Sequence, residues 1–199
     1  MAGDTWGYEP GGGGGPDLSD EVDALDTRVT ALEEAEGDTT LLWSMVDMIS
    51  AAAGSVFYNL GDYTVGQPFR ATRRGLSIAG ARWRWDGTAG KTLRLTLWDE
   101  TGSLLKSATA TASAGAVQSV SWATPYEIPD AKIYQTLYLG LYQTDGAQYL
   151  SYDLLSSYVA PALPIPAGPI LFLAGSYGAG NSWPSTPSSN TRALEPMLA

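Results

Sequence analysis

The chain has 199 residues, 44% of them hydrophobic, and a formal net charge of −10. This length allows one substantial folded domain and an appendage. The absence of cysteine excludes disulfides, thiolate metal sites and thiol nucleophiles, and the absence of histidine removes the usual general base and the commonest metal ligand. We therefore expect a protein that is not an enzyme and that binds no cofactor and no metal.

Most of the negative charge is local, because nine acidic residues and one arginine lie between residues 17 and 38. The arginines further along are diluted by apolar strands, which disfavours a nucleic-acid partner. No apolar run reaches the roughly 18 residues that a membrane span needs, and the first residues lack the pattern of a signal peptide. We expect synthesis in the cytoplasm and no membrane insertion.

Residues 1–16 contain two aromatic residues, Trp6 and Tyr8, followed by the glycine run 11–15. A Gly-rich run of this kind behaves as a flexible linker. Two hypotheses remain open for this segment. It is either a disordered tail or an anchoring peptide that docks Trp6 and Tyr8 into a larger assembly.

Residues 17–37 carry a heptad stripe that predicts a coiled coil. A helix with so narrow an apolar seam cannot bury it alone and needs copies of itself or a partner. The acidic residues around the seam are typical of a solvated outer surface. The seam consists of Leu18, Val22, Leu25, Val29 and Leu32.

The number of strands in this coiled coil is indicated by residues 28–33. The segment from Arg28 through Val29 and Leu32 to Glu33 resembles the short trimerisation motif of fibrous and viral coiled coils, in which arginine reaches glutamate of the next chain. The β-branched residues at a and leucine at d favour two strands instead. We favour a homotrimer, with a dimer as the alternative.

Residues 38–54 are predicted to form a neck. Gly37 and Asp38 look like a helix stop followed by a new cap, and a second helix is expected over 40–53. Its apolar residues form two adjacent stripes. The helix should therefore pack both against sister chains and against the following domain.

From residue 55 to 199 the hydrophobic period changes from helical to two, which predicts a β-sandwich domain. We expect a strand around 78–85, a turn at Asp86-Gly87, and a partner strand at 91–98. Another turn at Thr101-Gly102 should lead into a strand at 104–111. Further strands are expected at 117–122, 133–143, 170–173 and 192–198.

Several segments of this domain form a recognisable set: 59–61, 68–69, 78–83, the LWDxxGxLL pattern at 97–105, 125–128 and Tyr138. Residues 57–153 thereby resemble an uncharacterised β-sandwich family found in bacterial surface proteins and phage structural proteins. The resemblance implies an antiparallel jelly-roll sandwich. It implies no activity.

Aromatic residues are the first candidate contact residues of this domain. Tyr134, Tyr138 and Tyr142 should share one face of the strand at 133–143, as a buried sheet face, a subunit interface or a surface that stacks on sugars. Trp83 and Trp85 should face the core or a subunit contact. Arg82 and Arg84, which alternate with them, should point outward, toward acids of a neighbouring chain.

The carboxylates offer little for catalysis. Most lie beside Gly, Thr or Pro, where a carboxylate forms turns through side-chain to backbone hydrogen bonds. Asp145-Gly146 should be such a turn. The carboxylates concerned are Asp86, Asp99, Glu100, Glu127, Asp130, Asp145 and Asp153.

Together these features predict a bacteriophage virion structural protein. We expect a trimeric tail-associated fibre or spike, in the manner of a minor tail protein, that reaches host cell-surface glycan and attaches to other virion proteins through its N-terminal peptide. One alternative is a capsid-bound head fibre or decoration protein. Another is a polysaccharide depolymerase with two carboxylates beside a cleft. A bacterial surface-binding module is disfavoured, because no secretion signal is seen.

Overall fold

The computed structural model describes residues 41, 44, 46–47, 56–59, 62–85, 89–143, 150–153, 164–188 and 194–199. All of them belong to the second of two units, Met1–Asp38 and Thr39–Ala199. The anchoring peptide at 1–16 and the coiled coil at 17–37 therefore lie outside the described residues, and the predictions for them stay predictions.

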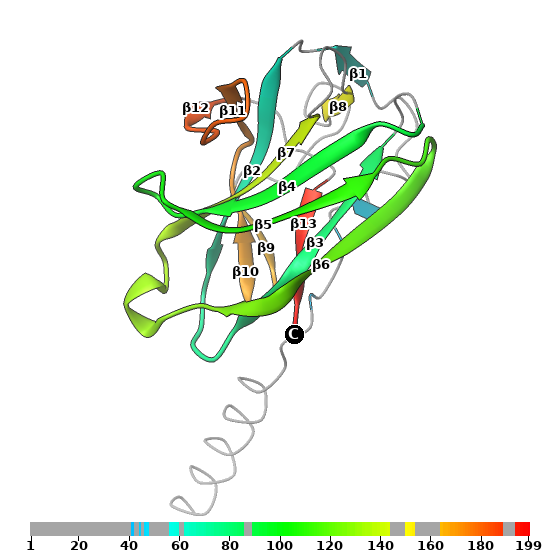
Figure 1. The fold of residues 1–199 in the computed structure, drawn as a ribbon. Helices are drawn as coiled ribbons and strands as arrows, with labels where there is room; N and C mark the ends of the chain where they lie inside the picture. The colour runs from blue at the N-terminus through cyan, green and yellow to red at the C-terminus, as the bar shows by residue number, and fades with distance from the viewer. Residues whose placement is uncertain are drawn as a thin grey trace, which may run out of the picture. The chain divides into compact units, whose positions relative to one another are not determined.

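Regular structure in the described residues is almost entirely β (Figure 1). One short 3-10 helix, η1 (Asp130–Lys132), interrupts the strands, and Val46 and Asp47 are helical. The strands are β1 (Val56–Asn59), β2 (Tyr63–Ala71), β3 (Ser77–Trp85), β4 (Thr92–Trp98), β5 (Leu104–Thr111), β6 (Ala116–Glu127), β7 (Thr136–Gln143), β8 (Leu150–Asp153), β9 (Ile165–Ala167), β10 (Ile170–Phe172), β11 (Ser176–Ala179), β12 (Thr186–Pro187) and β13 (Leu194–Leu198).

The strands form a large sheet, a small sheet and one separate pair. The large sheet has the order β12-β11-β2-β7-β4-β5, with β10 and β9 added beside β2, and the small sheet has the order β13-β3-β6. β1 pairs with β8. Every pairing between the named strands is antiparallel. The predicted mainly-β, antiparallel class is thus confirmed.

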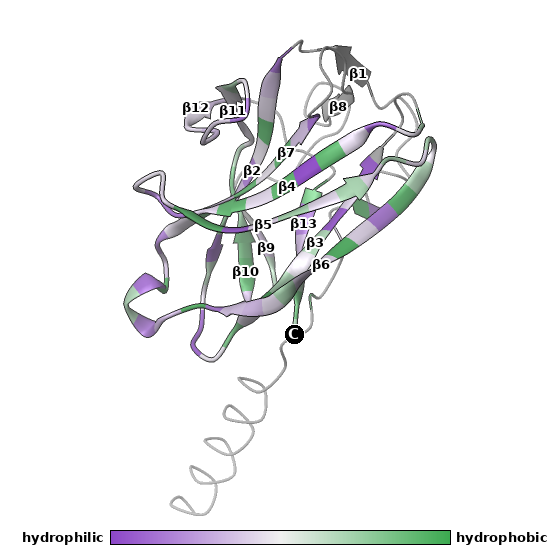
Figure 2. Ribbon diagram, viewed as in Figure 1, coloured by the Kyte–Doolittle hydropathy of each residue, from purple (hydrophilic) through white to green (hydrophobic). Residues whose placement is uncertain are grey.

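The core collects the inward side chains of both larger sheets into one hydrophobic cluster. β4 contributes Leu93, Leu95 and Leu97, all fully buried, and the polar residues between them produce the alternation seen along β4 in Figure 2. From the small sheet, Trp83 enters the same cluster with no exposed surface. The period-two pattern therefore has its expected cause, which is burial of one face of each sheet.

The predicted pairing of the strand at 78–85 with the strand at 91–98 is wrong. β3 pairs with β6 and β13, whereas β4 pairs with β5 and β7. Trp83 of β3 and Leu95 of β4 face the same core from different sheets, and both are fully buried. If β3 and β4 formed a hairpin, both strands would lie in the same sheet, and the small sheet would lack its central strand.

The other expected strands are observed, some with different ends. β5 matches its predicted range, β4 begins one residue later than predicted, and the two form a hairpin. β10 and β13 occupy the last two predicted segments. β6 continues to Glu127, beyond the predicted end at 122. β7 begins at Thr136 rather than 133, because Tyr134 has a left-handed backbone with φ of 63° that an extended strand does not allow.

Candidate functional site

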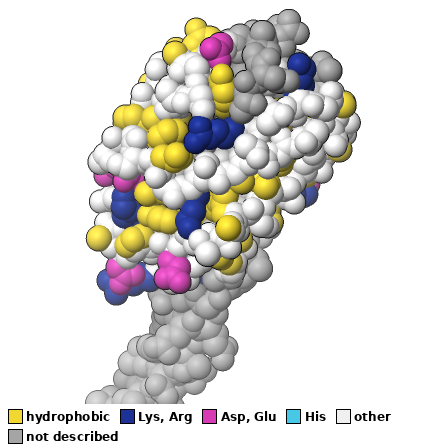
Figure 3. All heavy atoms as spheres, in the orientation of Figure 1, with side chains coloured by type: hydrophobic (Ala, Val, Ile, Leu, Met, Phe, Trp, Pro, Cys, Tyr) yellow, Lys and Arg dark blue, Asp and Glu magenta, His cyan; other side chains and the backbone are white. Residues whose placement is uncertain are grey.

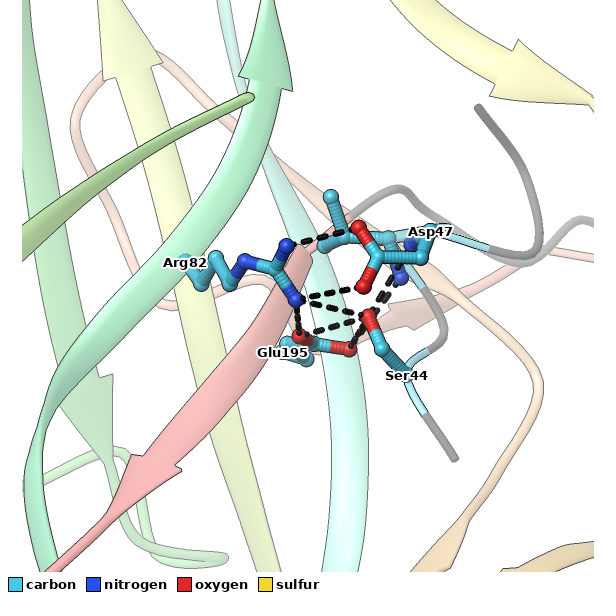
Figure 4. Close-up of polar contacts among 5 residues, drawn as sticks. Ser44, Asp47, Arg82 and Glu195 are labelled. Carbon is cyan, nitrogen blue, oxygen red and sulfur yellow. Dashed lines mark hydrogen bonds and ion pairs between the residues drawn. The ribbon is translucent and has the colours of Figure 1, made fainter. Parts of the chain in front are cut away.

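Four side chains fasten the start of the neck to the small sheet, and we call them the neck cluster: Ser44, Asp47, Arg82 and Glu195 (Figure 4). Arg82 lies on β3 and Glu195 on β13, and the two residues face each other across the sheet in register. The Arg82 Nη1 to Glu195 Oε1 distance is 3.1 Å, and the Nη2 to Asp47 Oδ1 distance is 2.6 Å. One guanidinium thus joins carboxylates that lie 148 positions apart in the sequence.

The neck cluster also satisfies the first amides of a helix. The Ser44 hydroxyl accepts a hydrogen bond from the Asp47 amide at 2.9 Å, as an N-cap residue does, and donates to the Glu195 carboxylate. The Val46 amide donates to Glu195 Oε2 at 3.1 Å. A carboxylate at this end of a helix is further stabilised by the helix dipole. The helical conformation is therefore held directly on β13.

Burial makes the charge of Glu195 dependent on its neighbours. Glu195 is 3% exposed, so its charge depends on Arg82, the Ser44 hydroxyl and the Val46 amide for compensation. The hydrogen bond from Arg82 holds the pKa of the Asp47 carboxyl below its ordinary value. The same hydrogen bond is the largest cause that raises the pKa of Arg82. The ion pair between Arg82 and Asp47 thus persists at neutral pH.

Two predictions for this region need correction. Arg82 does point away from the core, but it pairs with acids of its own chain rather than of a neighbour, because the neck segment folds back onto β3 and β13. Leu41 and Ser44 are not helical, so helical structure begins after Ser44 and not at 40. The pattern Ser44-x-x-Asp47 is a capping-box signature that could have located this start.

A second cluster, the hairpin cluster, surrounds Asp99 at the β4–β5 turn. Asp99 Oδ1 accepts hydrogen bonds from the amides of Thr101 and Ser103, both at 3.0 Å, and from the Thr101 hydroxyl. Lys132, at the end of η1, reaches Asp99 Oδ2 at 2.8 Å. This confirms a turn-forming role for Asp99. It also ties the hairpin to the connection between β6 and β7.

The hairpin cluster predicts a pH-dependent stability. Lys132 is the largest cause that holds the pKa of Asp99 far below its ordinary value. A lowered folded-state pKa stabilises the folded chain at neutral pH, and this contribution is lost as the pH falls below about 4. Asp99→Asn should therefore lower the free energy of unfolding by about 1–2 kcal/mol at pH 7, with a shrinking difference toward pH 2. Urea unfolding at several pH values measures it.

Asp130→Asn is the matched control for that experiment. Asp130 lies 3.6 Å from Arg74, with both side chains mostly exposed, so its loss should change the unfolding free energy by less than about 0.5 kcal/mol. An equal effect of both substitutions at pH 7 would contradict a special role for Asp99.

The three predicted tyrosines do not form one continuous ladder. Tyr134 precedes β7 and is 63% exposed. Tyr138 and Tyr142 share the outer face of β7, since Leu137, Leu139 and Leu141 fill the inner face. Tyr138 packs edge to face against Trp183, with ring centroids 5.7 Å apart. A hydrogen bond with Asp62 is the largest cause that raises the pKa of Tyr142.

Beside Tyr138, opposite charges flank one threonine, and we call this group the Thr136 site: Arg70, Glu100, Thr136 and Tyr138. Arg70 Nε donates to the Thr136 hydroxyl at 3.2 Å, and the Thr136 amide donates to Glu100 Oε2 at 3.3 Å. Arg70 is the neighbour of Thr136 on β2, and Trp98, two residues before Glu100, is the neighbour of Tyr138 on β4. The site was not predicted, because its members come from β2, β7 and the β4–β5 turn.

The face of the described residues drawn in Figure 3 is mixed in character. On the face drawn in Figure 3, hydrophobic side chains are interleaved with scattered basic and acidic ones. Among the residues that the structure describes, no group of three or more acidic side chains is arranged to hold a metal. No helix in that part of the chain is long and apolar enough to cross a membrane.

Other predicted residues fall outside the described part of the chain. They include the anchoring residues Trp6 and Tyr8, the coiled-coil seam with Arg28 and Glu33, and the turns at Asp86 and Asp145. No known family model and no curated protein sequence matches this chain. The assignment of a function therefore depends on the residues themselves.

Proposed function

We propose that the chain is a bacteriophage virion structural protein, a homotrimeric tail-associated fibre or spike that contacts the host surface and has no catalytic activity of its own. The observation that carries this proposal is the neck cluster. A buried carboxylate on β13 holds the first helical turn after Ser44, so the segment that follows the predicted coiled coil is fastened to the β domain by several hydrogen bonds. Such a joint suits a projecting domain on a stalk.

The jelly-roll sandwich remains part of the proposal. The two larger sheets share one core and all their named pairings are antiparallel, which supports a sandwich. The Asp99 carboxylate at the β4–β5 turn supports a structural role, since it pairs with Lys132 and accepts hydrogen bonds from two amides of the turn. A depolymerase would need two carboxylates free to flank a sugar.

The coiled coil supplies the test of assembly. Val29→Asp combined with Leu32→Asp places charge on the apolar seam and should weaken the trimer. Light scattering after size exclusion should give a mass of three chains for the parent and a lower mass for the double variant at the same concentration. Asp26→Asn with Glu34→Gln, which alters charge outside the seam, is the control.

Three results would contradict the proposal. A parent mass of a single chain would remove the stalk and favour a surface-binding module. Release of reducing ends from a bacterial polysaccharide would favour the depolymerase. A trimer found on the capsid rather than the tail, by antibody labelling of particles, would favour the head fibre or decoration protein.

A further inference from the structure

The Thr136 site contains an arginine and a glutamate that approach each other without pairing. Arg70 and Glu100 both contact Thr136, one through its hydroxyl and the other through its amide. They lie on opposite sides of it, because β7 runs between β2 and β4. Among the described residues they form no ion pair with each other within 4.0 Å.

Each of these two side chains contacts Thr136 through one polar atom and has further polar atoms that form no hydrogen bond with the described residues. Arg70 is held by its Nε, and among the described residues its two Nη atoms have no hydrogen-bond partner. Glu100 is held through Oε2, which leaves Oε1 without a donor in the same part of the chain. Arg70 is half-buried and Glu100 is exposed. The site thus presents donors and an acceptor on either side of Thr136, each held by one hydrogen bond to that residue.

An aromatic ring completes the arrangement. Tyr138 is the next outward residue on β7 and is positioned against Trp183. Burial raises the pKa of its hydroxyl, the charge of Glu100 raises it further, and the charge of Arg70 lowers it. The pair of charges sums to zero. The site therefore favours neither an anion nor a cation.

We infer that the Thr136 site binds a neutral saccharide. A sugar ring has adjacent hydroxyls that can accept from Arg70 and donate to Glu100, and an apolar face that suits an aromatic side chain. The inference deepens the proposed function, because it rests on the host-contacting role and names the chemistry of the contact. It assigns that contact to Arg70 and Glu100 rather than to a row of three tyrosines.

The test uses labelled full-length protein on an array of neutral and acidic oligosaccharides. The parent should bind neutral glycans, and Arg70→Gln and Glu100→Gln should each weaken that binding by about tenfold, the effect of losing a hydrogen bond to a charged group. Arg94→Gln on β4 and Glu127→Gln on β6 are the matched controls and should bind as the parent does. Thermal unfolding verifies that every variant is folded.

The inference is overturned by absence of binding to neutral glycans, by binding that Arg70→Gln and Glu100→Gln leave unchanged, or by binding confined to acidic glycans. Light scattering separates this result from the proposed function. A trimer that binds no glycan would overturn the saccharide site alone, whereas a monomer that binds through Arg70 and Glu100 would overturn the fibre alone.

Discussion

Replacing Glu195 by alanine is expected to lower the free energy of unfolding by about 2–4 kcal/mol. The buried carboxylate accepts hydrogen bonds from the Ser44 hydroxyl, the Val46 amide and Arg82. Without it, the Val46 amide loses its acceptor. Arg82 keeps its bond to Asp47 at the exposed side, which limits the loss.

Urea unfolding at pH 7 measures this effect, and limited proteolysis locates it. Glu195→Ala should be cleaved faster within residues 41–47, because the segment loses its attachment to β13. Glu127→Ala, on the exposed face of β6, is the control and should change stability by less than about 0.5 kcal/mol. A stable Glu195→Ala with parental cleavage kinetics would show that the neck cluster does not hold the neck.

Gly80→Ala is expected to destabilise the chain by about 3 kcal/mol or more, because no side chain fits at this point of β3. A Cβ at Gly80 would overlap the Val120 carbonyl oxygen and would lie 2.9 Å from Ser121 Cα. Both are backbone atoms of the paired strand β6. They can move only by separating β3 from β6.

The close approach arises from a bulge in β6. The register shifts between Ile78 and Gly80, so that residues 122–125 lie opposite Ala79 alone. This bulge directs Trp122 into the core, where it is 6% exposed. Gly80→Ala should therefore also expose Trp122, and tryptophan fluorescence should shift to longer wavelength.

Gly90→Ala is the matched control for the same substitution. Nothing lies within 4 Å of a Cβ at Gly90, and only its left-handed φ of 80° opposes alanine. Its cost should be about 1–2 kcal/mol. Equal midpoints for Gly80→Ala and Gly90→Ala in urea would contradict the steric argument.

Local patterns were sufficient wherever one strand and one turn decided the outcome. The alternation of Leu93, Leu95 and Leu97 predicted β4, and Thr101-Gly102 predicted the following turn, where Gly102 has a φ of 83°. Asp99 was expected to form a turn and does so through two amides. Each of these features depends on residues a few positions apart.

The same local patterns could not predict which distant strands pair with each other. An alternation of apolar residues indicates that one face of a strand is buried, but it does not indicate which strand lies beside it. β3, for example, pairs with β6 and β13 and not with the next strand in the sequence. For the same reason, Tyr134 could not be separated from Tyr138, since the left-handed turn after η1 depends on the Tyr134 amide reaching the Ala71 carbonyl on β2.

The mainly-β class and most strand positions could be read from the sequence alone, because a hydrophobic period of two follows from burial of one face of a strand. The composition alone also excluded the chemistry of cysteine and histidine. Only the tertiary structure joined Glu195 to Ser44 and placed Arg70 and Glu100 on either side of Thr136. These contacts depend on strand order, which is decided by how two sheets share one core.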